Sequence, residues 1–529
     1  MAGPPLQRVL LPADRTSVPA EQRPDRAARR LAHAAIVATA VSVATVVAVG
    51  ALGPSAAVPA FGAASPWPPW FAPADPPAVL VSVALWAAVL LGGAGLGMGL
   101  LAARHGWQPR PGRLVAGSLI AVVALLVVPP VGSTDMMDYA VYGRIAALGG
   151  SPYRMTPLEL RATGDPVGAL APTPWDNRPS VYGPLATATE WAAASLGAGS
   201  AGRTVFWLKV WNALAYLATT LALDRLTRSD RARRIRAHLL WSVNPLMLLA
   251  VLAGGHIDGL SAALAVLAVA SLSPRGRWCP SPRRAVLAGL LLGAAVAVKA
   301  PLLLVGAGLA WAMRRSPRAL AALVAGMLAV LVPGYLVAGW AAVSALAGRA
   351  AGSSSVYDPW LLTRGLGLHL STGSIDILGA CGSLTLAVIM LWRLPAGLAS
   401  YPFAQPALAL LLGWLIATPQ QRPWYDAAVF PLLVVMPATR LDWVAVARAV
   451  TAALAQLPGV TYYPSLVPGW LSASARAISV TAVPVALVGI ALALCWLCAS
   501  GRWESRQAAR DGPRLLAAPP AGMPPASPG

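Results

Sequence analysis

The sequence is poor in charge, in cysteine and in lysine. Only 11% of its 529 residues are charged, compared with about 25% in a typical soluble chain. Only two of its 40 basic residues are lysines, Lys209 and Lys299. Its four cysteines (Cys279, Cys381, Cys495 and Cys498) predict no extracellular disulfide framework. Against these shortages, 57% of the residues are hydrophobic, which excludes a chain of several soluble domains.

The apolar residues form long runs and predict an all-α polytopic membrane protein. The net charge of +21 could indicate nucleic-acid binding. The basic residues are largely confined to short loops and tails, however, so we expect the lipid bilayer as a partner and no nucleic acid. Because several runs are shorter than the ~20 residues of a full crossing, we expect about 12–14 transmembrane helices. The predicted spans are 34–53, 78–103, 115–132, 204–223, 238–254, 258–272, 285–298, 301–313, 319–340, 375–392, 405–418, 427–438, 443–457 and 477–499.

The distribution of basic residues predicts the orientation of these spans. With a cytoplasmic N-terminus, 29 of the 40 basic residues fall on the cytoplasmic side, Arg448 among them, together with 8 of the 19 acidic residues. This placement requires a chain reversal at Lys299-Ala300-Pro301, where proline interrupts the helical hydrogen bonds. We therefore expect a multi-pass plasma-membrane protein with both termini cytoplasmic. Residues 1–33 and 501–529 are predicted to be disordered tails, and 34–500 a membrane domain with a large outer loop at 133–203.

Polar and aromatic residues gather in that outer loop. Asp135 and Asp138 lie three residues apart, so one helical turn would place them on the same face. Asp135 could act as a general base towards a hydroxyl, or Ser133 or Asp135 could simply cap a short interfacial helix. The aromatic and arginine residues around them favour a sugar or phosphate site. These residues are Tyr139, Arg144, Tyr153, Trp175 and Tyr182.

Further candidates lie in the other outward turns. His256 and Asp258 follow two glycines at the end of a span, and they either serve function or pair with each other to close a hairpin. Lys299 either extends to the membrane interface or binds a lipid-linked phosphate. Arg364 and Arg422 are forked donors suited to a phosphate. Trp424 and Tyr425 could belong to the site or to an interfacial aromatic belt.

The order of these motifs resembles one family. Asp135-x-x-x-Tyr139, Gly143-Arg144, Pro152-Tyr153, Trp175 and Tyr182-Gly183-Pro184 are followed by Asn244-Pro245, Gly255-His256-x-Asp258 and Lys299-x-Pro301. Over roughly residues 34–500 the pattern resembles bacterial GT-C glycosyltransferases, in particular the actinobacterial polyprenol-phosphate-mannose-dependent α-(1→6)-mannosyltransferases. Ser151 stands where that pattern has Asn or Asp.

The resemblance implies a GT-C-like helical bundle and an inverting transfer on the outer face of the plasma membrane. The expected donor is a polyprenyl-phosphate sugar and the expected acceptor a glycan or lipoglycan, with Asp135 as general base. Asp138, Tyr139, Arg144, Tyr153, Trp175, Tyr182, His256, Asp258, Lys299, Arg364, Arg422, Trp424 and Tyr425 are the predicted substrate-binding residues. Because no nucleotide leaves, no cofactor is obligatory. A divalent cation held by Asp135, Asp138 or Asp258 is an open alternative.

Other functions fit parts of this pattern. A transporter or flippase of polyprenyl-phosphate sugars would also have many spans and broken helices. Its polar site would lie at mid-membrane, whereas the polar residues here gather on one face. A GT-C transferase using another sugar such as arabinose, and a catalytically silent assembly partner, are further alternatives.

Overall fold

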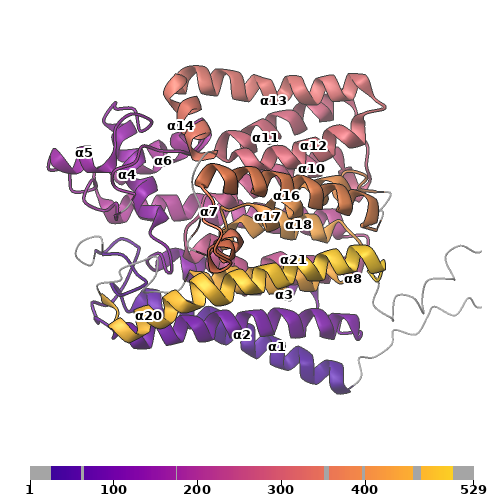
Figure 1. Ribbon diagram of the computed structural model, residues 1–529, viewed down its shortest axis with the longest axis horizontal. Helices are drawn as coiled ribbons and strands as arrows, with labels where there is room; N and C mark the ends of the chain where they lie inside the picture. Colours follow the sequence, from indigo (N-terminus) through magenta and orange to yellow (C-terminus); the bar gives the residue numbers. More distant parts are fainter. Residues whose placement is uncertain are drawn as a thin grey trace, which may run out of the picture.

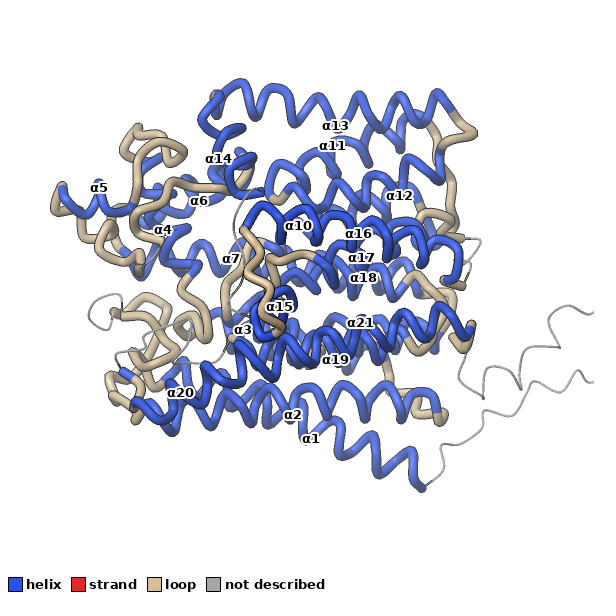
Figure 2. The backbone as a smooth tube through the Cα atoms, viewed as in Figure 1, coloured by secondary structure: helices blue, strands red, loops and turns tan. Residues whose placement is uncertain are grey.

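The structure is a computed structural model that describes residues 26–60, 65–173, 175–350, 355, 357–395, 400–456 and 466–503. Most of the two predicted tails therefore lies outside the described residues. The first helix nevertheless begins at Arg26, eight residues before the predicted first span. Helices joined by loops make up the described chain, which contains no strand (Figure 2).

All fourteen predicted spans contain a helical segment, and the prediction of an all-α polytopic membrane protein is confirmed. Seven segments are long and apolar enough to cross a bilayer. They are Arg26–Ala51 (α1), Ala78–Arg104 (α2), Ala201–Thr227 (α7), Arg231–Ala253 (α8 to η2), Pro317–Ala338 (α13), Thr372–Arg393 (α16) and Gly469–Ser500 (α20 to α21). The shorter members of the bundle are Pro111–Val127 (α3), Asp258–Leu272 (α10), Pro282–Val298 (α11), Leu303–Met313 (α12), Ala404–Ala417 (α17), Val429–Val434 (α18) and Leu441–Ala455 (α19).

The bundle has two distinct ends. The helices of the predicted outer loop gather at one of them (Figure 1). α1 begins and α21 (Val483–Ser500) ends at the opposite one. The outer-loop helices are Asp135–Ala147 (α4), Pro157–Ala162 (α5) and Pro184–Gly197 (α6). This arrangement has the two-ended topology that the charge distribution requires, while the end that faces the cytoplasm stays a prediction.

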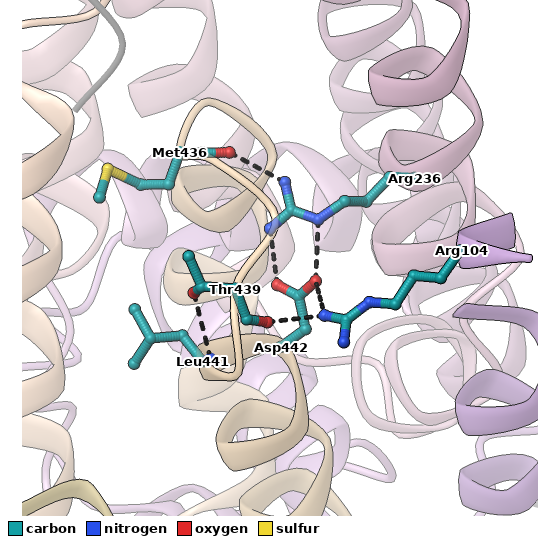
Figure 3. Close-up of polar contacts among 6 residues, drawn as sticks. All are labelled: Arg104, Arg236, Met436, Thr439, Leu441 and Asp442. Carbon is teal, nitrogen blue, oxygen red and sulfur yellow. Dashed lines mark hydrogen bonds and ion pairs between the residues drawn. The ribbon is translucent and has the colours of Figure 1, made fainter. Parts of the chain in front are cut away.

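The end opposite the outer-loop helices is held together by a buried ionic cluster (Figure 3). Arg236 donates hydrogen bonds of 2.9 and 2.6 Å to the two carboxylate oxygens of Asp442. Arg104, at the last position of α2, lies 3.6 Å from the same carboxylate and donates to the Thr439 carbonyl at 2.8 Å. The cluster therefore joins α2, α8 (Arg231–Ala237) and α19.

The helices are interrupted at two places where the sequence contains proline, once inside the predicted span 238–254 and once between the predicted spans 285–298 and 301–313. At Asn244-Pro245 the helix restarts, because the Asn244 side chain accepts hydrogen bonds from the amides of Leu246 and Met247 at 3.0 and 3.4 Å. At Lys299 the backbone is extended between α11 and α12. A Cβ on Gly306 of α12 would lie 2.9 Å from Leu292 of α11, so the chain folds back on itself. The predicted reversal is confirmed.

The outer-loop helices have a small core of their own. Met136, Tyr139 and Ile145 of α4 are buried against residues of α6 and the start of α7. α4 and α6 approach closely at Gly143 of α4, where a Cβ would lie 2.2 Å from the carbonyl oxygen of Glu190 in α6. This packing fixes the first turn of α4, and with it Asp135, above the membrane bundle.

Candidate functional site

Asp135 is the first residue of α4 and points away from its own helix end. The Ser133 hydroxyl accepts a hydrogen bond from the Asp135 amide at 3.2 Å, a local turn contact before the helix. The Asp135 carboxylate, 23% exposed, lies instead 3.3 Å from Nδ1 of His256. The Tyr139 hydroxyl donates to the same oxygen at 3.5 Å. The cap position of α4 is Thr134, without a side-chain capping hydrogen bond. Neither Ser133 nor Asp135 therefore caps the helix, and the Asp135 carboxylate is available for another role.

His256 is held rigidly behind that carboxylate. The π-helical segment Leu248–Ala253 (η2) precedes it, and Gly255 adopts a φ of +72°. A Cβ on Gly255 would come within 2.1 Å of Met136, so this turn requires glycine. The buried imidazole stacks on the Trp424 ring with 3.4 Å between centroids. His256 thus pairs with Asp135 across the fold, and not with Asp258 two residues later.

An ion pair lies across the same site. Lys299, in the extended link between α11 and α12, places Nζ 2.6 Å from the Asp258 carboxylate at the start of α10. The same Nζ lies 4.6 Å from the centroid of the Tyr425 ring. The lysine side chain is 14% exposed and that of Asp258 only 7%. Lys299 is therefore a cation of the site, fixed from two sides.

The link between α17 and α18 supplies the opposite wall. It carries Arg422, Trp424 and Tyr425, the last two in the short 3₁₀ helix Pro423–Ala428 (η6). Arg422 donates to the Ser355 hydroxyl at 2.7 Å, and its guanidinium lies 5.9 Å from the Trp424 ring. Trp424 is only 5% exposed. Because its contacts are with His256 and Arg422, it belongs to the site and not to an interfacial belt.

These residues surround one cavity of about 780 Å³. Its polar part is lined by Asp135, Asp138, Lys299 and Arg422. It continues along α11 and α16, where most lining residues are small or apolar, with Asp376 of α16 among them. The small and apolar ones are Val296 and Val298 of α11, and Gly379, Ala380 and Ser383 of α16. One continuous space therefore joins the charged groups to a mostly small or apolar wall on α11 and α16.

The two carboxylates of the first α4 turn have opposite electrostatic environments. Burial by itself would raise the pKa of Asp135, but the adjacent His256, followed by the charges of Arg422 and Lys299, lowers its pKa overall. Burial, and next the negative charge of Asp135, raise the pKa of Asp138 well above its usual range. Oδ1 of Asp138 is buried without a hydrogen-bond partner. Asp135 is therefore the ionised carboxylate of the pair.

Most of the predicted site residues meet at this cavity. The residues that line it are Asp135, Asp138, Tyr153, Trp175, Tyr182, Lys299, Arg422, Trp424 and Tyr425. Three predicted residues lie behind this lining. Tyr139 contacts Asp135, His256 contacts Trp424, and Asp258 contacts Lys299. They support the wall of the cavity.

Two predicted substrate-binding arginines lie elsewhere. Arg144 pairs with Asp165 at 2.8 Å within the outer-loop helices and does not line the cavity. Arg364, on the short helix Leu362–Gly365 (α15), has an exposed side chain and is also absent from the lining. Neither arginine therefore belongs to the cavity that the other predicted residues line.

Several cavity residues were missed by sequence reasoning. Tyr142 and Arg178 line the cavity beside Trp175, and the Tyr142 hydroxyl donates to the Arg178 carbonyl at 2.9 Å. Tyr335 of α13 and Asp376 of α16 line its far side. Both lie inside predicted spans, and only an acidic residue within an apolar run could have drawn attention to Asp376.

The described residues contain no preformed cluster of metal ligands for the predicted divalent cation. Within the described ranges, no group of three or more His, Cys, Asp or Glu side chains is arranged to hold a metal ion. Of the three proposed ligands, Asp135 is paired with His256 and Asp258 with Lys299.

Comparisons with known proteins agree with the resemblance in the sequence. The family model for the N-terminal domain of alpha-(1->6)-mannopyranosyltransferases matches residues 37–315. A probable alpha-(1->6)-mannopyranosyltransferase of Mycolicibacterium smegmatis is 28% identical over 362 residues, which cover 59% of this chain and 63% of that protein. An alpha-(1->6)-mannopyranosyltransferase of Mycobacterium tuberculosis is 24% identical over 381 residues, with the same coverage of 59% and 63%.

The aligned part thus spans a little under two thirds of these relatives. Alpha-(1->6)-mannopyranosyltransferase B of Corynebacterium glutamicum is 25% identical over 185 residues, or 34% of this chain and 31% of that protein. No solved structure matches. The matched family region contains Asp135, His256, Asp258 and Lys299, and it covers more than half of the chain. The chain therefore belongs to the alpha-(1->6)-mannopyranosyltransferase family.

Proposed function

We propose that this protein transfers mannose from polyprenyl-phosphate-mannose to an α-mannan or lipoglycan acceptor, forming an α-(1→6) bond at the outer face of the plasma membrane. The observation that carries the proposal is the cavity itself. A carboxylate of lowered pKa faces two cations in a space that continues along spanning helices. A lipid-linked sugar phosphate needs these three features together.

The residues divide the reaction between them. The acceptor hydroxyl oxygen attacks the anomeric carbon while the bond from that carbon to the phosphate oxygen breaks. The electron pair leaves with the phosphate, and Lys299 and Arg422 stabilise its developing charge. The hydroxyl proton passes to the Asp135 carboxylate. A direct displacement of this kind inverts the anomeric centre.

Neighbouring groups orient these participants. His256 and Tyr139 contact the Asp135 carboxylate and hold it in one rotamer. Trp175 and Tyr182 line the cavity on the outer-loop side, where flat aromatic surfaces suit a glycan acceptor. The polyprenyl tail would follow the apolar wall of α11 and α16, which a membrane bundle can offer directly to the lipid.

The proposal is tested by a transfer assay on the purified protein in lipid nanodiscs. Wild type should elongate an α-mannoside acceptor from polyprenyl-phosphate-mannose, and Asp135→Asn should lower turnover by about a hundredfold or more. Asp165→Asn is the matched control, because Asp165 lies in the same helical cluster, pairs with Arg144 and does not line the cavity. Its turnover should stay close to wild type.

Each unfavourable result points to a different error. Near wild-type turnover of Asp135→Asn would refute the base assignment. Absence of transfer by the wild type, with labelled donor lipid crossing the bilayer, would favour a flippase over a transferase.

A further inference from the structure

The link between α17 and α18 is an irregular stretch of chain inside a helical bundle. Residues 418–428 contain no α-helix, yet they carry Arg422, Trp424 and Tyr425 into the cavity. An irregular segment at this depth must have its backbone groups satisfied by the protein. The residues that satisfy them determine where the three side chains point.

Gln421 supplies the first part of this support. Its fully buried side chain donates from Nε2 to the carbonyls of Leu415 at 3.0 Å and Thr418 at 2.8 Å. These carbonyls are among the groups that a helix leaves unpaired at its C-terminus. The side-chain oxygen Oε1 accepts a hydrogen bond from Arg448 of α19 at 2.9 Å.

Arg448 connects Gln421 to the far end of the segment. Its Nη1 donates to the Asp426 carboxylate at 2.6 Å, and both side chains are only 1% exposed. One guanidinium thus bridges a residue just before Arg422 and a residue just after Tyr425. The charge pattern predicted Arg448 on the cytoplasmic side, but the structure places it inside the bundle, in contact with the site segment.

The pair is not optimised for stability. Oδ1 of Asp426 and Nε of Arg448 are both buried without a hydrogen-bond partner. A buried ion pair with unsatisfied groups is often replaced by apolar residues without loss of stability. Its geometry, one guanidinium whose two Nη groups reach both ends of one segment, fits a role in specifying the conformation of that segment.

We infer that Arg448, acting through Gln421 and Asp426, is a positioning residue that holds the 418–428 segment so that Arg422 faces the donor phosphate. The activity readouts below depend on the proposed function, whereas the conformational readout does not. The double variant Arg448→Met with Asp426→Leu removes both charges and leaves no buried ion.

The matched control uses the ionic cluster at the opposite end of the bundle. Arg236→Met with Asp442→Leu removes a pair that is similarly buried and also involves α19 (Figure 3). Neither Arg236 nor Asp442 lines the cavity. Both double variants and the wild type are compared in nanodiscs. Hydrogen–deuterium exchange reports on residues 418–428, and steady-state kinetics give separate KM values for donor and acceptor.

The Arg448 double variant should remain folded but exchange residues 418–428 at least about tenfold faster, the loss expected for hydrogen bonds to a charged group. Its KM for the donor should rise by about the same factor while the KM for the acceptor stays unchanged. The control should change neither quantity. Wild-type exchange in residues 418–428 of the Arg448 variant would overturn the inference. If the wild type itself transfers no mannose, the proposed function fails and the exchange comparison alone decides the positioning role.

Discussion

Lys299 has two neighbours that suggest different roles, and a pair of variants separates them. Its Nζ forms an ion pair with Asp258 at 2.6 Å and also lines the cavity. Lys299 could therefore act on a substrate phosphate or serve only as the counter-ion of a buried carboxylate. Lys299→Met removes both functions together. Lys299→Met with Asp258→Asn removes the cation without leaving a buried negative charge.

The two variants should differ strongly in stability. Asp258 is 5% exposed, so loss of its partner leaves an uncompensated charge, which costs about 3–5 kcal/mol. In the double variant the side chain at position 258 is a neutral amide, and the remaining loss should be about 1 kcal/mol, the net value of one hydrogen bond. Thermal unfolding in detergent measures this difference.

Transfer activity, unlike stability, should fall by the same factor in the single and the double variant. Removing one charged hydrogen-bond donor from the substrate phosphate should weaken transition-state stabilisation by about 1.5–3 kcal/mol. This loss corresponds to a fall of about tenfold to a hundredfold in kcat/KM for polyprenyl-phosphate-mannose. We expect this fall in both variants, measured as transfer from polyprenyl-phosphate-mannose. A stable double variant with wild-type kcat/KM would refute the phosphate role and leave Lys299 as a counter-ion only.

Two other predictions concern single positions. Arg422→Met should lower kcat/KM for the donor substrate by about tenfold or more, because a charge-assisted hydrogen bond to the phosphate is lost. Arg364 does not line the cavity, so Arg364→Met should have wild-type kinetics. Equal losses in the two variants would contradict the assignment of Arg422 to the phosphate. Glu190 of α6 is fully buried with both carboxylate oxygens unpartnered, and burial raises its pKa to about 8. Because the folded state holds this proton more tightly than the unfolded state, stability should fall as the pH rises from about 4.5 to 8. Glu190→Gln should remove that loss, so its melting temperature should exceed that of the wild type at pH 8.5 and match it at pH 5; identical pH profiles would show that Glu190 is ionised or solvated.

The membrane helices were predictable because apolar length is a local property of the chain. The helical segments in the fourteen predicted spans, seven of them long enough to cross a bilayer, and the reversal at Lys299 follow from apolar runs, proline and the distribution of arginine. The same charge rule failed for Arg448, because it counts residues by position in the sequence and cannot detect a buried partner such as Asp426.

The site was predictable only in part, because its geometry depends on contacts between distant segments. Motif order brought Asp135, His256 and Lys299 together correctly. Their pairing did not follow from spacing: His256 pairs with Asp135, 121 positions away, and not with its sequence neighbour Asp258. Asp376 lies in an apolar helix without a motif, and its place in the cavity depends on how α16 packs.

The most direct test of the account is linkage analysis of the product formed by the purified wild-type protein from polyprenyl-phosphate-mannose and an α-mannoside acceptor. The measurement identifies donor sugar, acceptor and bond together. The account predicts a single added mannose per turnover in α-(1→6) linkage, with the product lost in Asp135→Asn. A product with another sugar or linkage, or no product from an intact protein, would contradict it.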